Sequence, residues 1–250
     1  MATTQRPPTT MPPGDVSPVR APARNLPWPL SLYRTAVGKK YVMAITGLAW
    51  MGFVLFHLLG NLKYYLGAED VDHYGEFLRE LLVPIFPRTV VLWMLRAGLI
   101  AAILLHVHAA WSLTRMNHRA DHKYASRRDF VAANFASRTM RWTGIIVGAY
   151  ILFHLADLTW GFANPDFVRG EIHHNMTVSL ERWWAALIYA VANIALFVHL
   201  WHGGWSLFQS MGWNNPRFNR WRSWFAWGFA SLIVVGNLTF PILIGTGVVD

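Results

Sequence analysis

The chain has 250 residues, of which 54% are hydrophobic and 14% are charged, and it contains 14 tryptophans. This composition excludes an ordinary soluble domain and is typical of a protein that lies mostly in lipid. The net charge of +9 comes from basic residues in short connections beside apolar segments, so nucleic-acid binding is not predicted. The absence of cysteine excludes structural disulfides, thiolate ligation of haem and iron–sulfur clusters held by this chain.

The first thirty residues are rich in proline and cannot build a hydrophobic core, so residues 1–30 are expected to form a disordered tail. Residues 31–250 are expected to form one transmembrane domain. Apolar segments long enough to cross a bilayer cover about 41–64, 89–115, 140–162, 183–209 and 222–248. The predicted fold class is all-α integral membrane, with five transmembrane helices of which the first four form an up-down bundle.

The distribution of lysine and arginine predicts the orientation of these spans. The N-terminal segment and every second connection carry sixteen basic residues, and the remaining connections carry five. Basic residues are retained on the cytoplasmic side. We therefore expect a multi-pass protein of the bacterial inner (cell) membrane with a cytoplasmic N-terminus and an external C-terminus.

Histidine is the residue type that carries chemistry in these apolar segments. An ionisable side chain at membrane depth is costly, so such a residue is a functional candidate, although a single histidine can also donate a hydrogen bond between helices. Six are found, spread over four segments: His57, His106, His108, His154, His199 and His202.

Counting along the spans predicts two layers of histidines. His57 and His154 fall in the outer half of the membrane, whereas His106 and His199 fall nearer the cytoplasm. The first and third spans of an up-down bundle are diagonal, as are the second and fourth. Each pair can therefore approach one metal from opposite sides, which is the geometry of two stacked haems with two histidine ligands each.

An internal repeat supports a doubled two-helix unit but leaves the ligands of one layer open. The sequence LFHL occurs at Leu55–Leu58 and again at Leu152–Leu155, and WSL occurs at Trp111–Leu113 and Trp205–Leu207. Aligning the WSL strings pairs His108 with His202 instead of His106 with His199. Asp157, three residues after His154, is a candidate for a hydrogen bond that fixes an imidazole tautomer.

Four stretches of the chain resemble the cytochrome b558-type membrane anchor of succinate dehydrogenase and fumarate reductase. They cover the chain from about Ser31 to the end. The first consists of GKKYVMAITG, which begins at Gly38, and FHLLGNL, which begins at Phe56. The other three are HVHAAWSLTRMN from His106, ILFHLADL from Ile151 and HLWHGGWSLFQSMGWN from His199.

The resemblance implies a five-helix subunit that holds two haem b groups and passes electrons from succinate to a membrane quinone, with menaquinone expected. It implies that His57 and His154 bind the distal haem and that His106 and His199 bind the proximal one. FAD and the Fe–S clusters then belong to flavoprotein and iron–sulfur partner subunits on the cytoplasmic face. A higher oligomer of the complex is compatible with the resemblance.

Quinone reduction also takes up protons, so a quinone site needs ionisable or hydroxyl groups at the membrane edge. Candidates on the cytoplasmic side are Ser31, Tyr33, Arg34 and Lys39, and candidates on the outer side are Glu76 and Glu80. One alternative is the dihaem anchor of another membrane oxidoreductase, such as a hydrogenase or formate dehydrogenase. Another is a haem-free transporter or anchor that uses histidine to move protons.

Overall fold

The computed structural model describes residues 27–124, 131–213 and 215–249, with side chains described outside 119–138. Within this part of the chain all regular structure is helical. Of the tail expected over residues 1–30, residues 1–26 lie outside the described residues. Helix α1 (Trp28–Tyr33) begins directly after that point.

The first half of the fold contains two long helices joined by short ones. Helix α2 (Ala36–Asn61) begins five residues earlier than predicted because Thr35 caps it: the Thr35 side chain accepts a hydrogen bond from the Gly38 N–H at 2.9 Å. The 3₁₀ helix η1 (Leu62–Leu66) and helix α3 (Ala68–Arg79) follow. Helix α4 (Val90–Tyr124) then returns along α2.

The second half repeats this plan and adds one helix. It consists of α5 (Val131–Leu158), α6 (Ile172–Leu180), α7 (Trp183–Ser210) and α8 (Pro216–Leu243). Helix α8 begins six residues before the predicted boundary at 222, because Asn215 caps it by accepting from the Phe218 N–H at 2.9 Å and Pro216 takes the first helical position.

Four helical segments of the described chain are long and apolar enough to cross a membrane. They are Ala36–Leu66, Val90–His118, Trp183–Ser210 and Pro216–Leu243. The predicted span over 140–162 is not among them, although the 28-residue helix α5 covers most of it. The protein is thus an all-helical membrane protein with four candidate spans in the part described.

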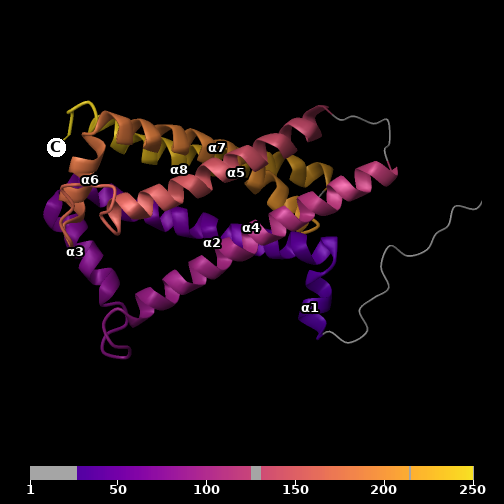
Figure 1. The fold of residues 1–250 in the computed structure, drawn as a ribbon, viewed down its shortest axis with the longest axis horizontal. Helices are drawn as coiled ribbons and strands as arrows, with labels where there is room; N and C mark the ends of the chain where they lie inside the picture. The colour runs from indigo at the N-terminus through magenta and orange to yellow at the C-terminus, as the bar shows by residue number, and fades with distance from the viewer. Residues whose placement is uncertain (1–26, 125–130, 214, 250) are drawn as a thin grey trace, which may run out of the picture.

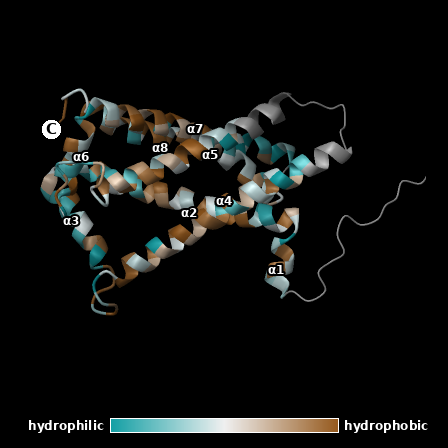
Figure 2. Ribbon diagram, viewed as in Figure 1, coloured by the Kyte–Doolittle hydropathy of each residue, from teal (hydrophilic) through white to brown (hydrophobic). Residues whose placement is uncertain are grey.

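The long helices pack as two antiparallel pairs with α8 added at one side (Figure 1). Helix α2 lies along α4, α5 lies along α7, and α7 also lies along α8, while α2 touches both α7 and α8. Helices α3 and α6 pack together at one end of the bundle, which we call the α3–α6 end. Helix α1 lies at the opposite end, called the α1 end. Figure 2 shows hydrophobic residues along the long helices and more hydrophilic ones on α3 and α6.

The best-packed core lies toward the α3–α6 end. Its most deeply buried apolar side chains are Leu58, Tyr64, Leu180, Ile233 and Ile244. Helices α2 and α8 approach closely there, because a Cβ placed on Gly236 would lie only 2.9 Å from both methyl carbons of Leu58. Asp72 ties α3 to α6 by accepting from the Ile172 and His173 N–H groups at 2.6 and 3.1 Å. This end therefore holds the ends of α2, α5 and α7 in a fixed arrangement.

Candidate functional site

The four histidines of the predicted ligand set lie on four different helices in two layers. His57 and His154 each stand four residues before the end of their helices, α2 and α5. His106 and His199 each stand sixteen residues after the start of α4 and α7. The ring centres of His57 and His154 are 5.8 Å apart, and those of His106 and His199 are 6.4 Å apart.

The spacing between the two layers follows from α2. Gly47 faces the His106 ring, since a Cβ on this glycine would lie 3.4 Å from Cε1 of His106. His57 comes ten residues after Gly47 on the same helix. At ~1.5 Å per residue the two layers are therefore about 15 Å apart along the helix axis.

His106 and His199 have the same surroundings. Nδ1 of His106 lies 3.2 Å from Oγ1 of Thr46, and Nδ1 of His199 lies 3.3 Å from Oγ1 of Thr143. The glycine that follows each threonine lies against the same histidine ring. A Cβ placed on Gly144 would lie 3.4 Å from Cε1 of His199, the same distance as from a Cβ on Gly47 to Cε1 of His106. The two halves of the chain thus build one local arrangement twice.

The threonine hydroxyls select a tautomer for both rings. Thr46 donates its only hydroxyl proton to the Val42 carbonyl at 2.7 Å, and Thr143 donates to the Thr139 carbonyl at 2.7 Å. Each Oγ1 is then an acceptor toward its histidine, so Nδ1 carries the proton. The lone pair is left on Nε2, the nitrogen available to a metal.

Tyr189 has the corresponding role at His154. Its hydroxyl donates to Oδ2 of Asp157 at 2.9 Å and lies 3.3 Å from Nδ1 of His154. Because the tyrosine proton points to the carboxylate, Nδ1 of His154 is the donor and Nε2 again carries the lone pair. The hydrogen bond expected between Asp157 and an imidazole is therefore indirect and passes through Tyr189.

Asp157 is fully buried and is the centre of a polar network. Arg182 donates to Oδ1 of Asp157 at 2.5 Å, and the buried Ser179 hydroxyl donates to Oδ2. Arg182 also donates to the Ala163 carbonyl at 2.6 Å. The carboxylate is thus paired and hydrogen-bonded, which is the condition under which a charge is tolerated in a protein interior.

His57 differs from the other three in its surroundings. Its ring stacks on Phe53 with centres 5.3 Å apart and planes 17° from parallel. Thr46, Trp50, Phe53 and His57 follow one another at helical spacing and share one face of α2. The indole Nε1 of Trp50 is buried on this face without a hydrogen-bond partner. A polar donor therefore lies between the two histidine layers.

The two alternative histidines lie outside the layers. His108 is exposed, and its Nδ1 lies 2.6 Å from the Tyr33 hydroxyl. His202 stacks on Trp201 with ring centres 4.6 Å apart, and its buried Nε2 has no hydrogen-bond partner. Neither shares the threonine and glycine environment of His106 and His199.

Two of the four quinone candidates at the α1 end, Tyr33 and Lys39, lie against each other. Lys39 is buried, donates to the Tyr33 carbonyl at 2.7 Å and places Nζ 4.9 Å from the centre of the Tyr33 ring. Burial raises the pKa of the Tyr33 hydroxyl, which lies 2.6 Å from Nδ1 of His108. Ser31 donates to the Trp28 carbonyl at 2.8 Å, whereas Arg34 is exposed.

The two acidic candidates lie beyond α2 at the α3–α6 end and are paired. Glu76 forms ion pairs with Arg79 and Arg88, and Glu80 lies 3.6 Å from Arg88. These carboxylates are partly exposed. They are therefore placed where protons from water can reach them, but each already has a basic partner.

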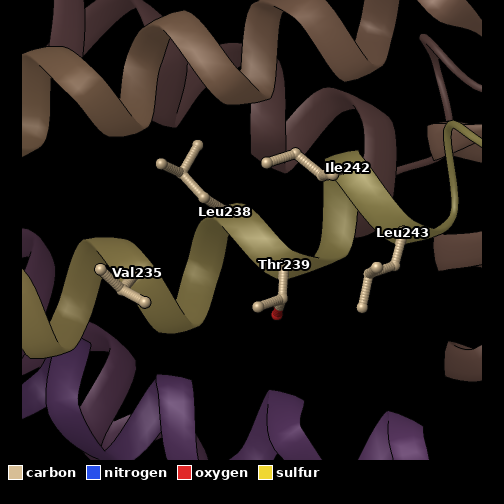
Figure 3. Close-up of a pocket in the computed structure, with 5 residues that line it drawn as sticks. All are labelled: Val235, Leu238, Thr239, Ile242 and Leu243. Atoms are coloured by element: carbon tan, nitrogen blue, oxygen red, sulfur yellow. The ribbon is translucent and has the colours of Figure 1, made fainter.

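The grooves of the described residues lie away from the histidine layers. A shallow one of about 300 Å³ runs along α8, with Leu238 and Ile242 on one side of the helix and Thr239 and Leu243 on the other (Figure 3). Its one hydroxyl, on Thr239, already donates to Gly236 and accepts from Tyr65 at 2.8 Å. This groove fits an acyl chain better than a polar headgroup.

A second groove of about 370 Å³ lies at the turn between α7 and α8, beside Gly212 and Trp213. Among the described residues no three histidine or acidic side chains gather as a metal site would require. The histidines therefore form pairs and not a larger cluster of protein ligands.

No family model, no curated protein and no solved structure matches the chain. A function for the chain is therefore argued from its geometry and its sequence motifs.

Thr46, Thr143 and Tyr189 were not predicted from the sequence. For the two threonines a signal exists in the sequence, because Thr-Gly stands ten residues before Phe-His in both halves, at Thr46–His57 and Thr143–His154. For Tyr189 there is no local signal, since it comes from a different helix than His154.

Proposed function

We propose that the chain is a dihaem membrane cytochrome b in which His57 and His154 hold one haem and His106 and His199 hold the other. The observation that carries this proposal is the separation of the two pairs of rings, 5.8 and 6.4 Å between centres. An imidazole that binds a metal lies with its ring centre about 3 Å from the metal, because the metal–nitrogen bond is about 2 Å and the nitrogen is about 1.1 Å from the ring centre. Two imidazoles on opposite sides of one metal therefore have ring centres about 6 Å apart. Both pairs fit this requirement.

The hydrogen bonds around the rings also fit haem ligation. A ligating histidine donates its other ring N–H to an acceptor, which fixes the tautomer and increases the basicity of the ligating nitrogen. Thr46, Thr143 and Tyr189 supply such acceptors to three of the four rings. A haem held in this way supplies one-electron transfer, with its potential set by ligands, hydrogen bonds and burial.

The particular protein we propose is the haem b anchor subunit of a succinate:quinone oxidoreductase. Support comes from the four stretches that resemble this family and from their positions, because His57, His106, His154 and His199 all lie in them. In this function the chain anchors the flavoprotein and iron–sulfur subunits, and it carries electrons toward a membrane quinone. Dicarboxylate chemistry belongs to a partner subunit.

The α1 end is the proposed side for the partner subunits and for one quinone site. Tyr33 and Lys39 combine a hydroxyl and an ammonium beside His108 at the edge of the bundle. These groups can hydrogen-bond to the oxygens of a quinone. Glu76 and Glu80 are the proposed proton-exchanging groups at the opposite membrane edge.

The proposal includes a fifth crossing of the membrane by α5. His154 belongs to this helix and needs to reach the same depth as His57 on α2. Five crossings place the two ends of the chain on opposite sides of a bacterial cell membrane. The positions of the basic residues favour a cytoplasmic N-terminus.

A difference spectrum tests the proposal directly. The complex is purified in detergent, spectra are recorded before and after reduction with dithionite, and haem b per chain is quantified as the pyridine haemochrome. Two haems b with low-spin bands per copy of this chain are expected. A preparation without haem would refute the proposal, and co-purification with a hydrogenase or formate dehydrogenase subunit would replace the succinate-linked role with the alternative one.

A further inference from the structure

Within the part of the chain that the structure describes, Arg222 is a buried cation without an anionic partner. It lies near the start of α8, is 4% exposed, and places its guanidinium 4.2 Å from the centre of the Trp205 ring on α7. Two of its nitrogens, Nε and Nη1, are buried without a hydrogen-bond partner. A buried guanidinium is stable when it is paired and its N–H groups are satisfied, so this arrangement indicates a binding partner.

The described chain offers no carboxylate near Arg222. Of the 13 acidic residues, Asp15, Asp121, Asp129 and Asp250 have side chains outside the described part, which leaves nine. All nine lie between residues 69 and 181, on α3, at the end of α5 and in the connections beside α3 and α6. Helix α8 ends near α6 and therefore begins, with Arg222, at the opposite end of the bundle (Figure 1).

Helix α7 also carries a second group without a hydrogen-bond partner among the described residues, one helical turn from the Trp205 ring that Arg222 contacts. His202 stands three residues before Trp205, so the two side chains are neighbours on the helix surface. Its Nε2 is buried without a partner. His199 stands three residues before His202 in turn, so His202 lies about 4.5 Å and Trp205 about 9 Å beyond His199 along the axis. His202 and Trp205 thus lie on α7 between the candidate ligand His199 and the contact with Arg222.

We propose that Arg222 and His202 form a binding site for an anionic group, a carboxylate or a phosphate, at the seam between α7 and α8. The planar guanidinium suits either anion because it can donate two parallel hydrogen bonds. One source of the anion is a propionate of the haem assigned to His106 and His199, and this source rests on the proposed function. The other is the phosphate of a membrane lipid, which does not depend on haem.

Two measurements on the detergent-purified complex test the site. Bound phospholipid is counted by native mass spectrometry, and each haem is titrated through its α band to obtain its midpoint potential. The variant is Arg222→Gln, and the matched control is Arg220→Gln, which removes the same charge from an exposed position two residues away on α8. Should Arg222→Gln fail to assemble, His202→Gln is measured in the same two ways.

The result separates the two sources of the anion. A haem carboxylate predicts that the potential of one haem falls while the other is unchanged, because a positive charge nearby favours the reduced form. A lipid phosphate predicts loss of a tightly bound phospholipid with both potentials unchanged. The proposal is overturned if Arg222→Gln, or His202→Gln in its place, gives the same phospholipid count and the same haem potentials as the wild type and Arg220→Gln. A complex without haem would refute the proposed function alone, because the lipid count would still test the site.

Discussion

Oγ1 of Thr46 lies 3.2 Å from Nδ1 of His106, and it can only accept from that ring because its own proton goes to the Val42 carbonyl. The equivalent contact joins Thr143 to His199 in the second half of the chain. Hydroxyls of this kind hold a ring in place, so they are the sharpest test of whether His106 and His199 are ligands.

Thr46→Val and Thr143→Val keep the shape of the side chain but remove the acceptor. We expect retention of one haem to weaken about ten- to hundredfold in each variant, as for other groups that orient metal ligands. Haem loss to apomyoglobin measures this. Thr114→Val is the control, because the Thr114 hydroxyl bonds to the Ala110 carbonyl on α4 and contacts no candidate ligand. Equal haem retention in all three variants would remove the role assigned to the two threonines.

Alanine substitutions separate ligands from neighbouring histidines. His106→Ala and His199→Ala are expected to retain one haem b of two, because one iron loses an axial ligand. His108→Ala is expected to retain both, since His108 is exposed and lies 2.6 Å from the Tyr33 hydroxyl. The pyridine haemochrome gives the haem count. Loss of haem in His108→Ala, with His106→Ala unaffected, would instead assign His108 and His202 as the ligands, which is the pair that the WSL alignment gives.

Tyr189→Phe removes the hydroxyl that accepts from His154 while keeping the ring. Without this acceptor the imidazole becomes a weaker donor to iron, so we expect the potential of one haem to rise and the other to stay unchanged. Spectroelectrochemistry resolves the two. Tyr150→Phe serves as the control, because the Tyr150 ring also packs against His154, with centres 5.7 Å apart. A rise of equal size in Tyr150→Phe would indicate a packing effect instead.

Asp157→Asn tests the buried network at the α3–α6 end. The change leaves Arg182 without its ionic partner in a region where Asp157 is fully buried. Breaking a buried pair costs about 3–5 kcal/mol, so a large fall in thermal stability in detergent is expected. The exposed Asp166 gives the matched control Asp166→Asn, for which no measurable change is expected. Equal stability of the two variants would show that the network is dispensable.

The contact between α1 and α4 is expected to depend on pH through Tyr33. Burial raises the pKa of this hydroxyl above its ordinary value of 10.0. A group with a raised pKa in the folded state contributes fully below its unfolded value, and the contribution is lost as pH rises through the folded value. The mobility of a spin label on α1 should therefore increase above about pH 10 and not between pH 8 and 10. Tyr33→Phe should abolish this step.

Apolar length is a local property, so the sequence predicted the all-helical class and four of the five spans, but it did not predict the short helices α3 and α6. The pattern Asn215–Pro216 even marks the start of α8, although the span was placed six residues later. The choice between His106 and His108 was not predictable, because His106 precedes Trp111 by five residues whereas His199 precedes Trp205 by six. Because of this difference of one residue, aligning the two WSL strings does not pair His106 with His199, although the structure places these two rings together.

The contacts of Asp157 could not be predicted for a different reason. Its partners Ser179, Arg182 and Tyr189 come from α6, the connection after it and α7, so only the fold brings them together. The sequence offered Asp157 as a direct partner of an imidazole, whereas the structure places the Tyr189 hydroxyl between Asp157 and His154. The haem assignment itself remains a prediction.

The same local arrangement occurs in both halves of the chain, and this indicates how the chain arose. Each pair of rings takes one member from equivalent helices of the two halves, so both pairs straddle a single pseudo-two-fold axis along the bundle. The protein thus resembles a fused dimer of a two-helix ancestor. Fusion allows the halves to diverge, and Tyr189 contacts His154 while His57 faces Phe53. Under the proposed function, the two histidines that hold one haem can in this way be tuned separately.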